Sequence, residues 1–227
     1  MPEMRRTDAD PSPFDDDRPA PAWQGDDVPP PWTAVGEGEV VFENPWLRVT
    51  RDSATAPTGA AADYVVARFR NLAVGVLPLH DDGTVTLVGQ QRFPLKNFVW
   101  EMPEGGAPFD EDPLEGVKRE LAEEAGLQAH YWREAVRLEL SNSVSDERAI
   151  GWVAWGLTPA AGQADDTEDI RVARVPFADL IKEIERGAVR DAFTVATAYR
   201  ALRMAQTGEL PAELARNLLA GVSLEPS

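Results

Sequence analysis

The sequence contains no cysteine and only two histidines, His80 and His130. Without cysteine the chain forms no disulfide, no thiolate nucleophile and no cysteine-ligated zinc or iron–sulfur centre. The two histidines have no recognisable partner pattern, so a multi-histidine metal site or a histidine-based triad is hard to build. Any acid–base or metal chemistry in this protein must therefore depend mainly on carboxylates.

Basic residues are also scarce, with 22 Lys and Arg against 39 Asp and Glu and a formal net charge of −17. Such a surface repels polyanions, so we expect no nucleic-acid partner and no attachment to anionic lipid. A small phosphorylated ligand is still compatible with this charge, because a bound metal ion reverses the local sign of the potential.

Long apolar runs are missing as well. No segment approaches the roughly 18 consecutive apolar residues that span a bilayer. The N-terminal sequence MPEMRRTDADPSPFDDD has no apolar centre of the kind that secretory signals carry. We therefore expect a soluble, cytoplasmic protein without a membrane partner.

Composition predicts four parts along the chain. Residues 1–35 are rich in Pro, Asp and Ala and are predicted to form a disordered tail, with ordered structure beginning near Glu37. Residues 36–62 are predicted to form an N-terminal strand extension, residues 63–207 the main domain, and residues 208–227 a short helix and tail.

Alternating strand and helix patterns predict the α/β class, with a mixed sheet flanked by helices. One helix is predicted from Asp112, which is a good N-cap, to Gly126, which is placed as its stop. Residues 54–62 are predicted to be a loop. The other predicted strands are residues 39–43, 47–51, 64–70, 73–79, 84–91, 98–102, 135–140, 149–157 and 170–175, and the other predicted helices are residues 177–186, 191–207 and 211–220.

The helix that begins after Asp112 has an apolar face beside a cluster of acids. At about 100° per residue its aliphatic side chains share one arc, and Glu120, Glu123 and Glu124 converge on the adjoining arc. A solvated acidic face is the ordinary interpretation of such a pattern. However, Glu120 and Glu124 repel each other at i,i+4, and acids late in a helix oppose its dipole. A bound hard cation such as Mg²⁺ would remove both problems.

The segment GGAPFDEDPLEGVKRELAEEAGL, which begins at Gly105, resembles the signature of the Nudix hydrolases. That signature is Gly, five residues, Glu, seven residues, Arg-Glu, an aliphatic, any residue, Glu-Glu, any residue, Gly and an aliphatic. At about one chance in fifteen per fixed residue, seven fixed matches arise roughly once in 10⁸ starts. Its places are held here by Gly105, Glu111, Arg119, Glu120, Leu121, Glu123, Glu124, Gly126 and Leu127.

The flanking segments VFENPWLRV, VGQQRFP, FVWEMPEGG and SNSVSDE resemble the ADP-ribose pyrophosphatase branch of this family over about residues 40–205. The resemblance implies an α/β/α sandwich with a mixed sheet and an N-terminal antiparallel strand extension. It also implies Mg²⁺- or Mn²⁺-dependent hydrolysis of a nucleoside diphosphate sugar, with ADP-ribose giving AMP and ribose 5-phosphate. The alternatives are another nucleoside diphosphate sugar, such as GDP-mannose, or a non-catalytic ligand-sensing module. Members of the branch are commonly homodimers, in which residues 37–52 would cross to the partner.

The resemblance also implies roles for particular residues. Glu120, Glu123 and Glu124 resemble the metal ligands, with the backbone carbonyl of Glu104 as a further ligand. Arg119 resembles the residue that pairs with a nearby acid and orients the ligands, and Glu111 resembles one that braces the loop or contacts the metal through water. Two residues depart from the family pattern, since Gly116 and Glu104 stand where the family usually or often has Ala.

The general base of the branch lies on a loop after the signature, which corresponds to residues 164–169. Glu168 is the predicted base, with Asp166 and Glu147 as alternatives. Arg92 is the predicted clamp for a substrate phosphate or ribose, with Arg51 and Arg68 as weaker candidates. Trp46 is predicted to stack on the nucleobase of the substrate, as are Phe42 and Trp100. Aromatic residues like these are more often part of a core.

Overall fold

The computed structural model describes residues 20–26, 28–160 and 169–222, which divide into two compact units. The N-terminal unit runs to Glu43 and also includes Val49–Val66. The larger unit contains Asn44–Arg48 and the chain from Ala67 onward. Among the described residues, no helix is both long and apolar enough to cross a membrane.

The N-terminal strands are β1 (Thr33–Ala34), β2 (Glu39–Glu43), β3 (Leu47–Thr55) and β4 (Ala61–Phe69). They form one sheet in the order β1-β3-β2, with β4 paired to β3. The predicted loop at residues 54–62 is wrong at both ends, because β3 continues to Thr55 and β4 begins at Ala61. Strand pairing also begins before the predicted start at Glu37, since β1 pairs with the end of β3.

The larger unit contains a mixed sheet of β5 (Asn71–Pro78), β8 (Glu104–Pro108), β9 (Leu127–Glu139) and β10 (Arg148–Pro159). Its order is β8-β5-β10-β9, with β5 and β10 parallel and the other two pairings antiparallel. A second, antiparallel sheet contains β6, β7 and β11 in the order β11-β6-β7. These strands span Thr84–Arg92, Asn97–Glu101 and Arg171–Pro176.

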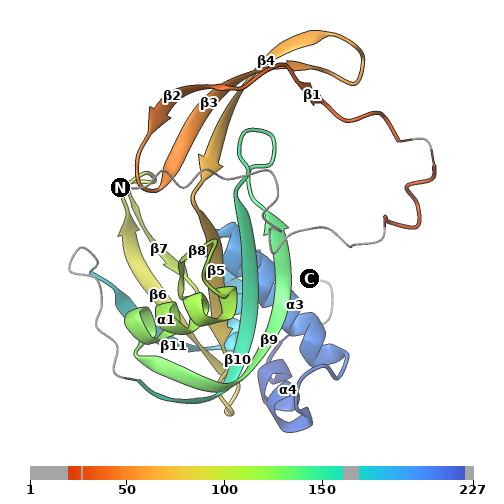
Figure 1. The fold of residues 1–227 in the computed structure, drawn as a ribbon. Helices are drawn as coiled ribbons and strands as arrows, with labels where there is room; N and C mark the ends of the chain where they lie inside the picture. The colour runs from red at the N-terminus through yellow and green to blue at the C-terminus, as the bar shows by residue number, and fades with distance from the viewer. Residues whose placement is uncertain (1–19, 27, 161–168, 223–227) are drawn as a thin grey trace. The chain divides into compact units, whose positions relative to one another are not determined.

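Helices cover both faces of the mixed sheet. Helix α1 (Pro113–Ala125) packs against β5, β8 and β9, whereas α3 (Ala192–Gln206) packs against β5, β9 and β10. Figure 1 shows α1 in front of this sheet and α3 behind it. The helices α2 (Phe177–Glu185) and α4 (Ala212–Leu219) pack against each other and against α3. The predicted α/β sandwich with a mixed sheet is therefore confirmed.

Helix α1 has the predicted boundaries. The side chain of Asp112 accepts a hydrogen bond from the backbone N of Leu114 at 2.9 Å, and Gly126 ends the helix in the left-handed conformation with φ 63°. Gly116 explains one departure from the family pattern. A Cβ at this position would lie 2.7 Å from the Cβ of Ala107 in β8, so the missing side chain lets α1 approach β8 closely.

Strand β8 was not predicted, and β9 begins earlier than the predicted residues 135–140. The β8 sequence EGGAP contains two glycines and a proline, which are typical of a loop. It is a strand because it pairs with β5, a contact distant in sequence that no local pattern reveals. The first half of β9 pairs with the far end of β10, so its strand structure also depends on a partner.

An ion pair that links α3 to the segment between α3 and α4 provides a test of acid stability. Glu209 accepts hydrogen bonds from Arg200 at 2.8 and 3.0 Å and from Arg133 at 3.2 Å. The hydrogen bonds from Arg200 come first among the causes that lower the pKa of Glu209 from 4.5 to about 2. The pair therefore stabilises the fold above about pH 4.5, and this stabilisation is lost as the pH falls toward 2. We expect Glu209→Gln to have a lower melting temperature than wild type at pH 7. The difference between the two melting temperatures should disappear near pH 2.

Candidate active site

Strand β8 and helix α1 bring the two ends of the Nudix-like segment together. The backbone N of Glu104 donates a hydrogen bond to Oε2 of Glu124 at 2.9 Å. The carboxylate of Glu120 lies over Gly105, where an added Cβ would come within 2.5 Å of both carboxylate oxygens. Two helix carboxylates therefore lie against adjacent residues of β8, Glu124 at Glu104 and Glu120 at Gly105.

Burial separates the three helix acids. Glu124 is 7% exposed and the side chain of Glu120 is 12% exposed, whereas that of Glu123 is 41% exposed. Glu120 and Glu124 thus lie at the edge of the core, and Glu123 lies farther out.

Arg119 connects these acids to β8. Its Nη1 donates to Glu120 at 2.6 Å and to Glu123 at 3.2 Å, and its Nη2 donates to the backbone O of Gly106 at 3.0 Å. Glu111 lies 3.7 Å from the same guanidinium group. Arg119 is therefore placed to hold the side chains of Glu120 and Glu123 in position.

The donor chemistry at β8 and α1 is suited to a hard divalent cation. Glu120 and Glu124 supply carboxylate oxygens from neighbouring positions against β8, and Glu123 adds a third carboxylate farther out on the same helix. Carboxylate oxygens are the ligands that Mg²⁺ prefers. Within the described ranges no three His, Asp or Glu side chains are already grouped as a complete ligand set. The residue types therefore fit a cation, and its binding would require the side chains to reorient.

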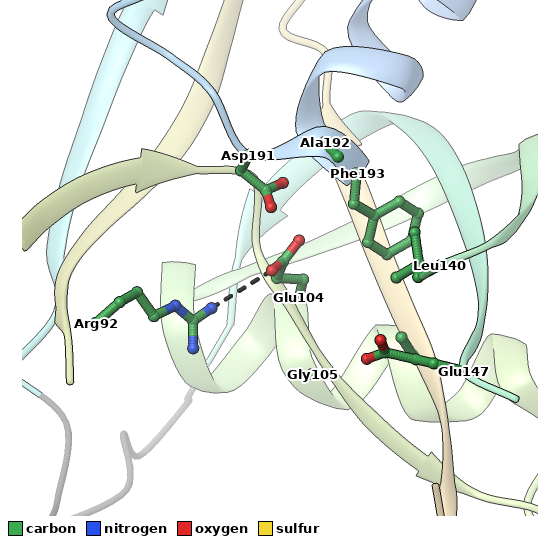
Figure 2. Close-up of a pocket in the computed structure, with 9 residues that line it drawn as sticks. Arg92, Glu104, Gly105, Leu140, Glu147, Asp191, Ala192 and Phe193 are labelled. Atoms are coloured by element: carbon green, nitrogen blue, oxygen red, sulfur yellow. Dashed lines mark hydrogen bonds and ion pairs between the residues drawn. The ribbon is translucent and has the colours of Figure 1, made fainter. Parts of the chain in front are cut away.

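A cavity of about 320 Å³ lies beside β8 (Figure 2). One part of its wall is apolar and another part carries charged side chains. Its lining residues are Ala73, Arg92, Glu104, Gly105, Leu140, Glu147, Asp191, Ala192 and Phe193.

Arg92 enters this cavity from the end of β6 and is held by a buried acid on β7. Its Nη2 lies 2.5 Å from Oε1 of Glu101, and its Nε donates to Oε2 at 3.2 Å. Glu101 is 2% exposed and also accepts a hydrogen bond from Gln90 at 3.0 Å. Burial lowers the pKa of Arg92, but the hydrogen bond and charge of Glu101 outweigh it and leave this pKa above its ordinary value. Arg92 is therefore a fixed cation in the cavity wall.

Two other carboxyl groups in the wall have raised pKa values. Burial raises the pKa of Glu104 well above its ordinary value, and the charges of Asp191 and Glu101 raise it further. Burial, and then the charge of Asp146, raises the pKa of Glu147. Perturbed acids in a cavity are typical of functional sites.

Gly105 offers a test of how closely β8 must approach α1. The backbone at this position does not need glycine for its φ angle, but a Cβ would displace the flexible carboxylate of Glu120. We expect Gly105→Ala to change the free energy of unfolding by no more than about 1 kcal/mol, because the side-chain end can move aside. We expect its kcat/KM to fall by about 10- to 100-fold, because the carboxylate is misplaced. Chemical denaturation and steady-state kinetics on the same preparation measure both quantities.

The three predicted substrate residues lie in different surroundings. Arg92 lines the cavity. Arg51 lies in the N-terminal sheet, where it is 3.7 Å from Glu39, and Trp46 is 68% exposed and does not line the cavity. The predicted base Glu168 and its alternative Asp166 lie outside the described residues, whereas the other alternative, Glu147, lines the cavity.

Several cavity residues were not singled out as site candidates by the sequence. Asp191 was predicted only as a helix cap, and its side chain does accept a hydrogen bond from the backbone N of Thr194 at 2.7 Å. Its position next to Glu104 depends on α3 packing against β5, which no local pattern reveals. Leu140 and Phe193, which line the cavity, and Glu101, which holds Arg92, resemble ordinary strand and core residues in the sequence.

Comparison with known proteins agrees with this geometry. A family model of the NUDIX domain matches residues 69–195, which includes β8, α1 and the whole cavity wall. The chain belongs to the Nudix family. It is a Nudix pyrophosphohydrolase that resembles the ADP-ribose pyrophosphatases.

Individual relatives are distant. The chain is 29% identical to an ADP-ribose pyrophosphatase from Mycobacterium tuberculosis over 149 residues, which cover 64% of this chain and 72% of the relative. It is 26% identical to a methanol dehydrogenase activator from Bacillus methanolicus over 159 residues, which cover 69% of this chain and 85% of that protein. A solved ADP compounds hydrolase has the same fold, with a TM-score of 0.67 and 20% identity over 79% of this chain and 97% of the other.

Proposed function

We propose that this Nudix protein hydrolyses the phosphoanhydride bond of a nucleoside diphosphate sugar. Its preferred substrate is ADP-ribose, and its cofactor is Mg²⁺ or Mn²⁺. The main support is the convergence of Glu120 and Glu124 on β8 beside a cavity that contains a fixed arginine. The similarity to an ADP-ribose pyrophosphatase supports the choice of sugar nucleotide.

In this reaction the oxygen of a water molecule attacks one phosphorus of the diphosphate, and the bond from that phosphorus to the bridging oxygen breaks. With ADP-ribose the products are AMP and ribose 5-phosphate. The proton lost by the water passes to a carboxylate base, for which we propose Glu168, with Glu147 as the alternative inside the cavity.

Glu120, Glu123 and Glu124, with the backbone carbonyl of Glu104, are the proposed metal-binding groups. A divalent cation at these groups would neutralise the diphosphate and lower the pKa of the attacking water. Arg119 would hold Glu120 and Glu123 in position, through the hydrogen bonds of 2.6 and 3.2 Å. Arg92 would pair with a phosphate oxygen or the ribose, because a guanidinium group fixed by Glu101 needs little reorganisation to bind.

A panel of nucleoside diphosphate sugars with Mg²⁺ tests the substrate. We expect kcat/KM to be highest for ADP-ribose, with AMP and ribose 5-phosphate as products. Turnover of GDP-mannose with no turnover of ADP-ribose would overturn the substrate assignment. It would still agree with hydrolysis of a phosphoanhydride bond. Binding of these compounds without turnover of any of them would favour a ligand-sensing module. A variant that lacks residues 1–35 should hydrolyse at the rate of the full chain.

We also propose that the protein is a homodimer in which residues 37–52 contact a second copy. Strand β2 carries Val40, Val41 and Phe42, which are 45–55% exposed, and adjacent exposed apolar side chains often mark an interface. Light scattering on the full chain should give twice the mass of one chain. The variant Phe42→Ser should shift the mass toward the monomer, and a wild-type mass of one chain would overturn this proposal.

A further inference from the structure

Glu104 stands where the resemblance leads us to expect Ala, and its side chain lines the cavity. Figure 2 shows its carboxylate between Arg92 and Phe193, below Asp191, with Glu147 reaching in from the other side. An alanine at this position, as the family often has, would leave this part of the cavity empty. The Glu104 side chain is therefore part of the surface that a ligand in this cavity would meet.

The hydrogen bonding of Glu104 is incomplete. One oxygen, Oε1, lies 3.4 Å from Nη2 of Arg92, but that nitrogen is closer to Glu101, at 2.5 Å. The other oxygen, Oε2, is buried and has no hydrogen-bond partner. A buried acceptor without a donor carries a free-energy cost, because it has lost its hydrogen bonds to water and gained none in the protein. A ligand that offers a hydrogen-bond donor at this point would recover that free energy.

The rest of the wall restricts the chemistry of that donor. Leu140 and Phe193 provide apolar surface, whereas Glu104, Glu147 and Asp191 supply carboxyl groups against a single arginine that is already paired. A sugar ring suits this wall, because it has C–H surface for the apolar side and hydroxyl donors for the carboxyl groups. A further phosphate on that sugar would face these carboxyl groups, and the one cation among the lining residues is Arg92, the proposed clamp for the diphosphate or the ribose. The cavity volume of about 320 Å³ lies at the lower end of the usual range for ligand pockets, roughly 300–1,000 Å³.

We propose that the Glu104 carboxyl group accepts a hydrogen bond from a hydroxyl of the sugar attached to the diphosphate. It thereby selects nucleoside diphosphates that carry a neutral sugar and disfavours those whose sugar carries a further phosphate. This inference rests on the proposed function. A carboxyl group keeps an acceptor oxygen whether or not it is protonated, so the contact does not depend on its ionisation.

Calorimetric binding of two analogues that the enzyme cannot cleave tests this role without turnover. The analogues are α,β-methylene ADP-ribose and α,β-methylene ADP, which lacks the sugar, both with Mg²⁺. For wild type we expect tighter binding of the sugar analogue. Glu104→Ala should weaken binding of that analogue by about tenfold, the effect of one lost hydrogen bond to a buried group, and leave binding of α,β-methylene ADP unchanged. Glu104→Gln keeps an acceptor oxygen and should lose less than Glu104→Ala.

A third analogue, α,β-methylene ADP-ribose with an added phosphate on its terminal ribose, tests whether Glu104 disfavours a phosphorylated sugar. Wild type should bind it more weakly than α,β-methylene ADP-ribose, and Glu104→Ala should narrow this difference. The exposed helix variant Glu115→Ala is the control and should bind all three analogues as wild type does. If Glu104→Ala does not fold, Glu104→Met fills the same space without an acceptor and takes its place.

The outcomes separate this inference from the proposed function. Equal weakening of both the sugar analogue and α,β-methylene ADP would assign Glu104 to the diphosphate and its cation, and would overturn the sugar contact. Unchanged binding of both analogues would also overturn it, with the proposed function intact. If wild type binds neither analogue, the proposed function fails and this inference fails with it.

Discussion

Replacing Glu124 with glutamine is expected to lower kcat/KM by about 10³-fold, because the change removes a buried anionic ligand from the proposed metal site. The fold should survive. The amide oxygen of glutamine can still accept the hydrogen bond that the backbone N of Glu104 donates to Glu124 at 2.9 Å. Steady-state hydrolysis of ADP-ribose with saturating Mg²⁺ measures the loss, and thermal unfolding shows whether the fold is retained.

Glu115 provides a matched control on the same helix. Its side chain is 60% exposed and pairs with Lys118 at 2.7 Å, so Glu115→Gln should leave both kcat/KM and the melting temperature near wild type. If Glu124→Gln kept more than a tenth of the wild-type kcat/KM, the helix carboxylates could not have the role we assign to them.

Replacing Arg92 with methionine is expected to lower the free energy of unfolding by about 3 kcal/mol. Glu101 is 2% exposed, and Arg92 is the cation that compensates its charge, with contacts of 2.5 and 3.2 Å. Without Arg92 a buried carboxyl group keeps only the hydrogen bond from Gln90, at 3.0 Å. For a chain of this size the loss corresponds to a decrease in melting temperature of about 6–12 °C.

The double variant Arg92→Met/Glu101→Met separates the ion pair from general packing. It removes both charges, so it should recover at least half of the stability lost in Arg92→Met. If the free energy of unfolding lost in the double variant equals the sum of the losses in Arg92→Met and Glu101→Met, the two side chains are not coupled. Hydrolysis should stay low in the double variant, because it also lacks the proposed substrate clamp.

The sequence predicted those parts of the fold that local chemistry determines. Asp112 and Gly126 define α1 by capping and by a left-handed backbone, and both effects depend on neighbours within a few residues. Strand β8 was not predictable, because two glycines and a proline form a strand only where β5 provides the hydrogen-bond partners. Long-range pairing of this kind leaves no periodic signal in a short segment.

In the candidate site, too, some features could be predicted from local sequence and others depend on long-range packing. The spacing of Glu120, Glu123 and Glu124 on one helix face was visible in the sequence, because three positions within five residues of a helix have fixed relative directions. The approach of Asp191 to Glu104 was not visible, since it depends on how α3 packs against the sheet. The buried pair of Arg92 and Glu101 joins two neighbouring strands, and its strength depends on burial that a sequence pattern does not show.

Titration of the wild-type protein with Mn²⁺, followed by electron paramagnetic resonance, tests the central claim most directly. In the presence of α,β-methylene ADP-ribose we predict that Mn²⁺ binds wild type and Glu115→Gln, and that binding is strongly weakened in Glu120→Gln and Glu124→Gln. Failure of wild type to bind Mn²⁺ at millimolar concentration, or hydrolysis of ADP-ribose at an undiminished rate in excess chelator, would contradict a cation held by these carboxylates.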